Sequence, residues 1–384
     1  MMDPVLMEQF SKLREQGMMK LKEEKEQGKK VVGMYCTYSP QELIMAAGAY
    51  PVSLCGTKQE PIGAAEKVLP HNMCPLIKSS YGFAATDTCP FFNFTDLLVA
   101  ETTCDGKKKM YELLAQYKPM HLLQLPQEQS SPQSKELWYQ EVLKLKERLE
   151  QHFNVEITPL KLREAIKLAN RERQALRTLY ELNRHIPAPL TGLEILTVAH
   201  NRGFYPDKEK VIGLLEELIA SVQAGLGNHK LQAGPRILLT GVPVGLGSEK
   251  VIKLVEELGG TVVCQENCTG YKPVDLLVDE DENKDPLLAI AEKYLAIACS
   301  CMSPNPGRYE LLGRLVKDFH VDGVLDLTWI GCHTYNIEAY SIKKYLDEQF
   351  GLPYLQVETD YSSSDTEQLR VRIEAFIEML QASV

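Results

Sequence analysis

The chain has 384 residues, of which 44% are hydrophobic and 24% charged, and its formal net charge at pH 7 is −10. This length exceeds what one hydrophobic core usually organises, so we expect two α/β domains with a helical insert. The negative charge argues against a nucleic-acid binder, which needs a basic face to displace counterions from phosphates. Because the sequence has neither an apolar stretch of membrane-spanning length nor an apolar N-terminal block, we expect a cytoplasmic protein without a membrane partner.

Residues 1–133 predict a first α/β domain. Helical and buried-strand patterns alternate here, which indicates a parallel sheet with right-handed crossovers. The predicted helices and strands, in chain order, are a helix over 4–27, a strand over 31–35, a helix over 42–49, a strand over 51–55, a helix from 75, a strand over 96–100, a helix from 105 and a strand over 120–126. A cysteine stands at the first strand-to-helix turn and another precedes the helix that begins at residue 105.

Residues 134–232 change to a helical pattern. Apolar residues repeat with a helical period around Leu162 and Leu214, and charged residues occupy the other faces. No catalytic arrangement stands out in this segment. We therefore expect helices that pack on or between the two α/β domains.

Residues 233–384 predict a second α/β domain. The predicted elements are strands over 236–241, 261–267, 321–332 and 353–360, and helices over 251–260, 285–298, 336–350 and 365–380. The glycine-rich residues Thr240–Gly247 are the candidate for a phosphate loop, but they lack the lysine and hydroxyl residue of a nucleotide-binding loop. A tight strand-to-helix turn is the simpler interpretation, so any ATP hydrolysis would fall to a partner.

Ten cysteines are the most informative feature of the composition. In a reducing compartment we do not expect disulfides, which leaves burial, catalysis or metal binding. Four cysteines follow predicted strands directly, two in each half: Cys36, Cys104, Cys268 and Cys332. Because ligands bind at the carboxyl ends of parallel strands, two sheets that face each other across a cleft would bring these sulfurs together.

Cys104 has the strongest local signal for a thiolate. It precedes the N-terminus of a predicted helix, and Lys107, Lys108 and Lys109 add positive charge. Scattered thiols of this kind favour an iron–sulfur cluster, and zinc or structural thiols remain as alternatives. His333, beside Cys332, and Glu266 are the candidates for catalytic proton transfer.

Seven stretches of the chain resemble the 2-hydroxyacyl-CoA dehydratase family of the D-component type. These are YCTYSPQELIMAAGAYPVSLCGT, NMCPLIKSSYGF, ETTCDGKKKMYELLAQYKP, QENCTG, ACSCMSPN, CHTYNIEAYSIKK and VETDYSSSDTEQLRVRIEAFIEML. The likeness is greatest to the single-subunit branch, which includes the double-cubane cluster proteins. It implies two Rossmann-like, doubly wound parallel-sheet domains with an oxygen-sensitive metallocluster in the cleft between them.

The resemblance also implies a ligand set. Dehydratase subunits of the family hold one [4Fe-4S] cubane through three cysteines, which by position correspond to Cys74, Cys104 and Cys332. Double-cubane proteins hold an [8Fe-9S] cluster through six. The six implied ligands here are Cys36, Cys74, Cys104, Cys268, Cys301 and Cys332, with Cys299 as the rival of Cys301. Cys55, Cys89 and Cys264 are interpreted as structural thiols.

The family further implies a separate ATP-hydrolysing iron–sulfur reductase that supplies electrons. The favoured interpretation is a homodimeric double-cubane reductase that acts on small molecules. The first alternative is an (R)-2-hydroxyacyl-CoA dehydratase with a [4Fe-4S] cluster and a ketyl-radical mechanism. The second is an electron carrier or cluster-storage protein. The sequence does not identify the physiological substrate.

Overall fold

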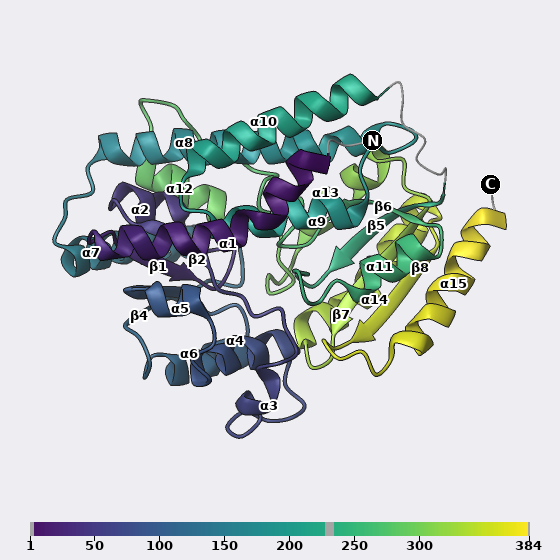
Figure 1. Cartoon of the computed structure of the whole chain (residues 1–384), viewed down its shortest axis with the longest axis horizontal. Coiled ribbons are helices and arrows are strands. Elements are labelled where there is room, and N and C mark those ends of the chain that lie inside the picture. Colours follow the sequence, from purple (N-terminus) through teal and green to yellow (C-terminus); the bar gives the residue numbers. More distant parts are fainter. Residues whose placement is uncertain (1–3, 227–233, 383–384) are drawn as a thin grey trace.

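The computed structural model describes residues 4–226 and 234–382 and contains two four-stranded parallel sheets (Figure 1). The first sheet has the order β2-β1-β3-β4, with β1 (Val31–Met34), β2 (Tyr50–Ser53), β3 (Leu97–Glu101) and β4 (Met120–Leu123). The second has the order β6-β5-β7-β8, with β5 (Arg236–Gly241), β6 (Thr261–Gln265), β7 (Gly323–Trp329) and β8 (Tyr354–Thr359). The predicted α/β class with two doubly wound parallel sheets is confirmed.

The two sheets repeat one topology. In each, the chain forms two neighbouring strands and then crosses to the other side of the first strand, so the order reverses beside β1 and β3, and beside β5 and β7. Such a reversal opens a crevice at the carboxyl ends of the strands, where ligands bind in doubly wound folds. The ends of β1, β3 and β7 lead to Cys36, Cys104 and Cys332.

The helices of the first half lie around its sheet. They are α1 (Pro4–Glu26), α2 (Gln41–Ala46), α3 (Ile62–Ala65), α4 (Pro75–Ala85), α5 (Pro90–Phe94) and α6 (Asp105–Leu114). Strand β3 is buried along its whole length, which agrees with its continuous apolar pattern. The short helices α3 and α5 were not predicted. Both lie in stretches rich in residues that also form turns, so their sequences lack a sustained helical period.

The middle of the chain is helical, as predicted. It contains α7 (Pro132–Phe153), α8 (Pro159–Glu181), α9 (Gly192–Asn201) and α10 (Lys208–Gly225), with short 3-10 turns η1 (Leu182–Arg184) and η2 (Arg202–Phe204). Helix α8 contacts α2 of the first half, whereas α9 contacts β6 of the second, so this segment joins both halves (Figure 1). The division at 133/134 and 232/233 stays a prediction, and the second boundary lies outside the described residues.

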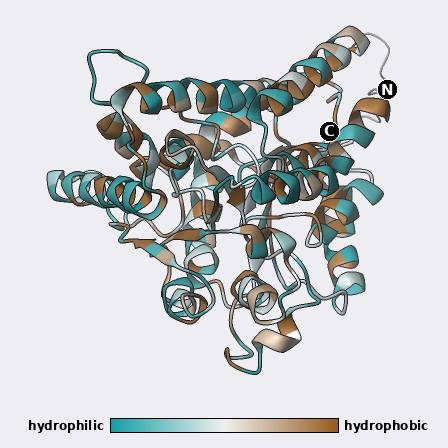
Figure 2. Cartoon of the chain, turned by 60° about the vertical axis from the view of Figure 1, so that its left-hand side comes forward, coloured by the Kyte–Doolittle hydropathy of each residue, from teal (hydrophilic) through white to brown (hydrophobic). Residues whose placement is uncertain are grey.

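The helices of the second half are α11 (Lys250–Glu257), α12 (Pro286–Leu295), α13 (Pro306–Asp318), α14 (His333–Phe350) and α15 (Thr366–Ala382). Helix α13 was not predicted from the sequence. Pro306 at its first position and the buried Leu311, Leu312 and Leu315 carry a helical signal that the preceding proline- and asparagine-rich residues obscured. The brown inner strands and the teal outer helix faces in Figure 2 show the amphipathic pattern from which the other helices were predicted.

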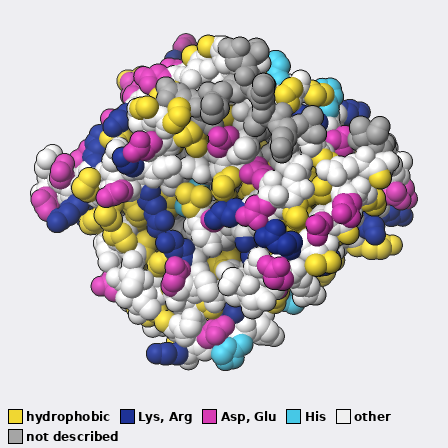
Figure 3. All heavy atoms as spheres, turned by 45° about the vertical axis from the view of Figure 1, so that its right-hand side comes forward, with side chains coloured by type: hydrophobic (Ala, Val, Ile, Leu, Met, Phe, Trp, Pro, Cys, Tyr) yellow, Lys and Arg dark blue, Asp and Glu magenta, His cyan; other side chains and the backbone are white. Residues whose placement is uncertain are grey.

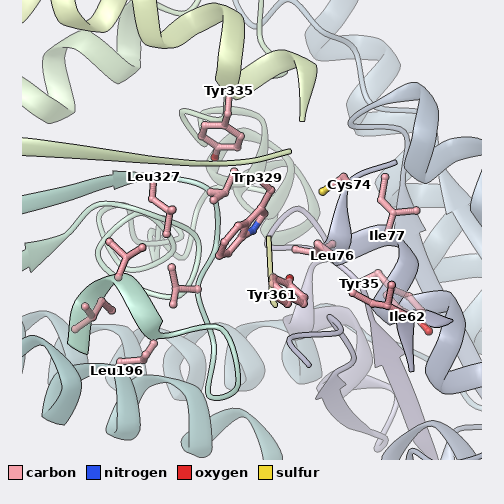
Figure 4. Packing of buried hydrophobic residues seen from close by; sticks show 14 of the residues in the cluster. Tyr35, Ile62, Cys74, Leu76, Ile77, Leu196, Leu327, Trp329, Tyr335 and Tyr361 are labelled. Atoms are coloured by element: carbon pink, nitrogen blue, oxygen red, sulfur yellow. The ribbon is translucent and has the colours of Figure 1, made fainter. Parts of the chain in front are cut away.

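One buried hydrophobic cluster contains residues of both halves. In Figure 4, Tyr35, Cys74 and Leu76 of the first half lie opposite Trp329 and Tyr361 of the second. The Tyr361 hydroxyl donates to the carbonyl oxygen of Gly56 at 3.0 Å, which adds a buried polar contact between the halves. These contacts hold the carboxyl ends of the two sheets facing each other.

Glycines permit the closest approaches between the halves. Gly331, which follows β7, has a φ of +75°, and a Cβ there would lie 2.5 Å from the carbonyl oxygen of Asn72 and 3.0 Å from the backbone nitrogen of Cys74. In the glycine-rich loop after β5, a Cβ on Gly245 would lie 2.5 Å from the side chain of Thr57. This loop therefore packs against the first half, which agrees with its interpretation as a tight turn.

The surface carries both signs of charge. Figure 3 shows Lys and Arg side chains interspersed with Asp and Glu over one face, with several cationic groups near its centre. None of the helices among the described residues combines the length and apolar character needed to cross a membrane.

Candidate metal centre

Three cysteines cap helices where the two halves meet. Cys74, Cys104 and Cys332 are the N-cap residues of α4, α6 and α14. Backbone N–H groups in the first turn of each helix favour negative charge on its sulfur. Burial nevertheless raises the pKa of the Cys104 thiol above its ordinary value, and the interaction with Cys74, together with burial, raises that of Cys332. In the metal-free chain the expectation of a thiolate at Cys104 is therefore not met, because burial outweighs the helix N-terminus and Lys107. Cys74 and Cys332 interact directly across the halves, and Cys104 faces both. We call these three residues the first thiol group.

A second thiol group lies next to the first. Its members are Cys36 after β1, Cys268 after β6, and Cys299 and Cys301 after α12. Cys36 faces Cys268 and Cys299, while Cys299 and Cys301 lie close enough to shift each other's pKa. Cys299 also faces Cys104, which joins the two groups. The structure thus brings together all six cysteines that the sequence analysis selected, and it adds Cys299 to them.

The other three cysteines differ in their surroundings. Cys55 lies near Cys268, but its thiol donates to the carbonyl oxygen of Tyr35 at 2.9 Å. Cys264 is buried within β6, and Cys89 is the N-cap of the short helix α5. Burial raises the pKa of all three thiols. These placements suit their interpretation as structural residues.

The spacing of the thiols bears on the kind of metal that they could hold. Within 4–226 and 234–382, no three His, Cys, Asp or Glu side chains converge closely enough to bind a single metal ion. A tetrahedral zinc site requires sulfurs at about 2.3 Å from one ion. A polynuclear cluster tolerates wider spacing because each thiolate binds a different iron. The soft, all-sulfur donor set therefore fits an iron–sulfur cluster better than a single ion.

Buried cations surround both thiol groups. Lys107 pairs with Glu101 at 2.8 Å, and Lys272 pairs with Glu266 at 2.9 Å. Arg308 lies 3.7 Å from Glu266 and also pairs with Glu338. Lys272 and Arg308 are almost completely removed from solvent and Lys107 is largely so, and at such sites their charges interact strongly with nearby thiolates. This environment stabilises several negative charges in one small volume.

Cys299 shows the effect of this environment most strongly. The hydrogen bond with Cys301 lowers the pKa of Cys299, burial opposes this, and Lys272 and Arg308 lower it further, to about 5. The Tyr335 hydroxyl lies 4.0 Å from the Cys299 sulfur. These interactions favour the thiolate form of Cys299, which is the form that binds metals.

Of the three lysines after Cys104, Lys107 interacts with several thiols, whereas Lys108 has a weaker interaction with Cys104. Lys107 is buried, and burial opposes its charge while Cys36 and Glu101 raise its pKa well above the usual value. Lys108 and Lys109 instead form exposed ion pairs with Asp105 and Glu112 at 2.8 and 2.6 Å. The expectation that all three lysines act on Cys104 is therefore correct in full only for Lys107.

The two candidates for proton transfer lie in contrasting environments. His333 is exposed at the first position of α14. Glu266 is completely buried, and it accepts a hydrogen bond from the Thr240 hydroxyl at 2.8 Å. Burial opposes the charge of Glu266, but Lys272 and Arg308 outweigh it and keep the pKa of this carboxyl below its ordinary value. Glu266 is thus placed to balance charge, and a proton-transfer role for either residue stays a prediction.

Sequence reasoning missed two residues that touch this centre. Glu101 is buried at the end of β3 beside Cys36 and Lys107, and burial raises its pKa. A carboxylate that ends the apolar run Leu97–Ala100 was the available signal. The Tyr335 hydroxyl accepts a hydrogen bond from Lys272 at 3.1 Å, and its position three residues after Cys332 could have marked it as a first-turn residue of the same helix.

A cavity of about 210 Å³ borders the second thiol group. Its wall includes Cys36, Cys55 and Cys268, together with Lys107 and side chains from α8 and α12. The first thiol group does not line this cavity. A molecule inside it would therefore approach the centre from the side of Cys36 and Cys268.

Comparison with known proteins agrees with this architecture. The chain is 49% identical to the Escherichia coli (strain K12) protein YjiM, named provisionally as a dehydratase subunit, over 98% of both chains. It is 24% identical to the beta subunit of (R)-phenyllactyl-CoA dehydratase from Clostridium sporogenes over 94% of both. It is 25% identical to a subunit of benzoyl-CoA reductase from Thauera aromatica, over 88% of this chain and 84% of that one.

The family model described as "2-hydroxyglutaryl-CoA dehydratase, D-component" matches residues 36–380, a span that begins at Cys36 and contains both thiol groups. The match covers nearly the whole chain, from just after β1 into α15, and so includes the second sheet and the helices between the two sheets. Together with the full-length similarity to the relatives above, it establishes that the chain belongs to the 2-hydroxyglutaryl-CoA dehydratase D-component family.

Proposed function

We propose that the chain is an iron–sulfur oxidoreductase with a double-cubane [8Fe-9S] cluster, which reduces small molecules with low-potential electrons from a separate ATP-hydrolysing iron–sulfur reductase. The observation that carries the proposal is the presence of two neighbouring thiol groups, close enough that Cys299 acts electrostatically on Cys104. A single cubane held by three cysteines would use only the first group. The second group supplies the additional thiolates that a double cubane requires.

The residues of the chain have defined tasks in this proposal. When bound, the cluster supplies a store of low-potential electrons. The helix N-termini at Cys74, Cys104 and Cys332 stabilise the thiolates, and the buried cations offset the remaining negative charge. The hydrophobic contacts between the halves bury Cys74, and Cys104 and Cys332 are half-buried beside it.

Within the second thiol group, the geometry favours Cys299 over the predicted Cys301 as the third ligand. Cys299 faces Cys36, Cys268 and Cys104, whereas Cys301 faces Cys299 and Cys36 and lies against Tyr38. Cys299 therefore has the central position in the thiol arrangement. Cys301 is placed to donate a hydrogen bond to it.

A pair of matched variants separates these assignments. Cys299→Ser should lose about half of the bound iron, because one of the two cubanes loses a ligand. Cys301→Ser should keep its iron and change the reduction potential, since it keeps a hydroxyl near the Cys299 sulfur. Iron analysis and a redox titration of anaerobically purified protein measure both effects. The opposite pattern, with iron lost from Cys301→Ser alone, would restore the predicted ligand set.

The alternative function is an (R)-2-hydroxyacyl-CoA dehydratase with one [4Fe-4S] cluster, and the dehydratase names of the relatives support it. The cavity favours the reductase. Its volume of about 210 Å³ lies below the roughly 300–1,000 Å³ typical of pockets for drug-sized ligands, so it does not enclose a CoA thioester. The third possibility, an electron carrier or storage protein, stays a prediction from the sequence. The homodimer likewise stays a prediction.

Activity assays distinguish the two enzymes. The iron-loaded protein, its ATP-hydrolysing reductase, ATP and a low-potential electron source are combined with small multiply bonded substrates or with 2-hydroxyacyl-CoA thioesters. We expect ATP-dependent reduction of the small substrates. Turnover of the thioesters alone would overturn the proposal in favour of the dehydratase, and turnover of neither would favour the carrier.

A further inference from the structure

The cavity beside the second thiol group has an unusual charge distribution. Six charged side chains line it, and five of them are cationic: Lys107, Arg173, Arg202, Lys208 and Lys293, with Glu172 as the carboxylate. They come from α6, α8, η2, α10 and α12, elements that are far apart in the chain. The cavity is therefore a product of the assembled fold, with a wall that is predominantly positive.

Carboxylates neutralise part of this charge. Four of the cations have partners: Lys107 pairs with Glu101 at 2.8 Å, Arg173 with Glu42 at 2.5 Å, and Arg202 and Lys208 share Glu172 at 3.0 and 2.7 Å. The five cations that line the cavity thus form ion pairs with three carboxylates, which leaves an excess of two positive charges among these paired and lining groups when all are ionised; Asp275, which also faces Lys293, pairs with Arg314 instead. An excess of this kind inside a protein calls for a counterion.

Lys293 is the cation without a partner. It is only 6% exposed and lines the cavity, yet it makes no hydrogen bond or ion pair with any residue that the structure describes. Its ammonium lies 4.1 Å from the centre of the Tyr294 ring. Arg202 adds a second unused donor, because its Nε is buried and lacks a hydrogen-bond partner among the described residues. A buried ammonium and a buried guanidinium N–H therefore both have unused donor capacity.

We propose that this cavity binds a small oxyanion, such as a carboxylate of a few atoms, with the Lys293 ammonium as its counterion. The same cavity borders Cys36 and Cys268, so a bound anion lies next to the thiol groups. That the bound anion is a substrate rests on the proposed function. That the cavity binds an anion rests on its cationic lining alone.

The surroundings of Lys293 give the site a pH dependence. The charged groups that face it are Arg173 from α8, Glu42 from α2 and Asp275 from the segment after β6. Burial and Arg173 lower the pKa of Lys293 well below its ordinary value, against the opposing effect of both carboxylates. A bound anion stabilises the ammonium form and raises this pKa. At a pH between the pKa of Lys293 in the free protein and its pKa in the complex, anion binding should therefore take up a proton on Lys293. The affinity for the anion should fall as pH rises through this range.

Calorimetric titration with acetate tests the site, and acetamide serves as the uncharged probe of similar shape. The wild-type protein should bind acetate at least about tenfold more tightly than Lys293→Met, since a hydrogen bond to a charged group is lost. Lys293→Arg should still bind acetate, but without proton uptake, because a guanidinium stays charged. Titrations in buffers of different ionisation enthalpy measure the uptake. Lys344→Met, which removes an exposed lysine on α14, is the control and should bind as the wild type does.

Several outcomes would overturn this inference. These are equal acetate affinity in the wild type and Lys293→Met, equal binding of acetate and acetamide, or acetate binding without proton uptake at every pH. Lys293→Met should remain folded, because methionine replaces a buried charge, and its thermal unfolding midpoint should not fall below that of the wild type. The titrations are repeated after chelation of iron. Retained binding in iron-free protein would separate the anion site from the cluster, so that either proposal can fail without the other.

Discussion

Lys272→Met should destabilise the protein by about 3–5 kcal/mol, the cost typical of removing one partner from a buried ion pair. Lys272 and Glu266 lie 2.9 Å apart, and both side chains are almost entirely buried. Without the ammonium, Arg308, at 3.7 Å, would be the remaining cation paired with the Glu266 carboxylate among the residues that the structure describes. Urea unfolding followed by circular dichroism measures the change in the free energy of unfolding.

A surface lysine variant and a double variant serve as controls for Lys272→Met. Lys253→Met removes a lysine that pairs with Glu249 at 2.6 Å on the surface, and should cost no more than about 1 kcal/mol. Adding Glu266→Gln to Lys272→Met should recover part of the loss, because the unpaired charge is removed. Since the pKa of Glu266 is held below its ordinary value, the ion pair contributes at neutral pH and is lost as pH falls through the folded-state pKa. Equal losses for Lys272→Met and Lys253→Met would contradict this account.

Cys104→Ala should lower ATP-dependent reductase activity by at least about 100-fold, since even residues that only support metal ligands often contribute 10–100-fold. Cys104 belongs to the first thiol group and also faces Cys299 of the second. Its loss should therefore disturb both groups and reduce the bound iron. Activity assays and iron analysis of the same preparation measure the two effects together.

Cys264→Ala is the matched control for this substitution. Cys264 is also a buried cysteine associated with a parallel sheet, but it lies within β6, away from both thiol groups. It should keep the iron content and activity of the wild type. If both variants lost iron to the same extent, general destabilisation would explain the loss, and the assignment of Cys104 would fail.

Much of the fold follows from local sequence signals. Continuous apolar runs such as Leu97–Ala100 predicted buried parallel strands, and proline after a cysteine predicted the start of α4. The helices α3, α5 and α13 were missed because turn-forming residues lie within or just before them. Local patterns identify elements that have a clear period, and they do not identify short helices whose stability comes from tertiary contacts.

The thiol groups were predictable in part. The rule that ligands bind at the carboxyl ends of parallel strands gave Cys36, Cys104, Cys268 and Cys332 from the sequence alone. Cys299 and its rival Cys301 lie in a loop, so no strand pattern could decide which of them faces the other thiols.

The buried cations that compensate the thiols could not be predicted. Lys272 and Arg308 are ordinary charged residues in the sequence. Tertiary packing within the second half buries them beside Glu266 and Cys299.

Iron and acid-labile sulfide analysis of anaerobically purified protein tests the central claim most directly. The two thiol groups predict about eight irons per chain, with a similar amount of sulfide, as a double cubane requires. About four irons would contradict the double cubane and return the chain to the single-cubane dehydratase.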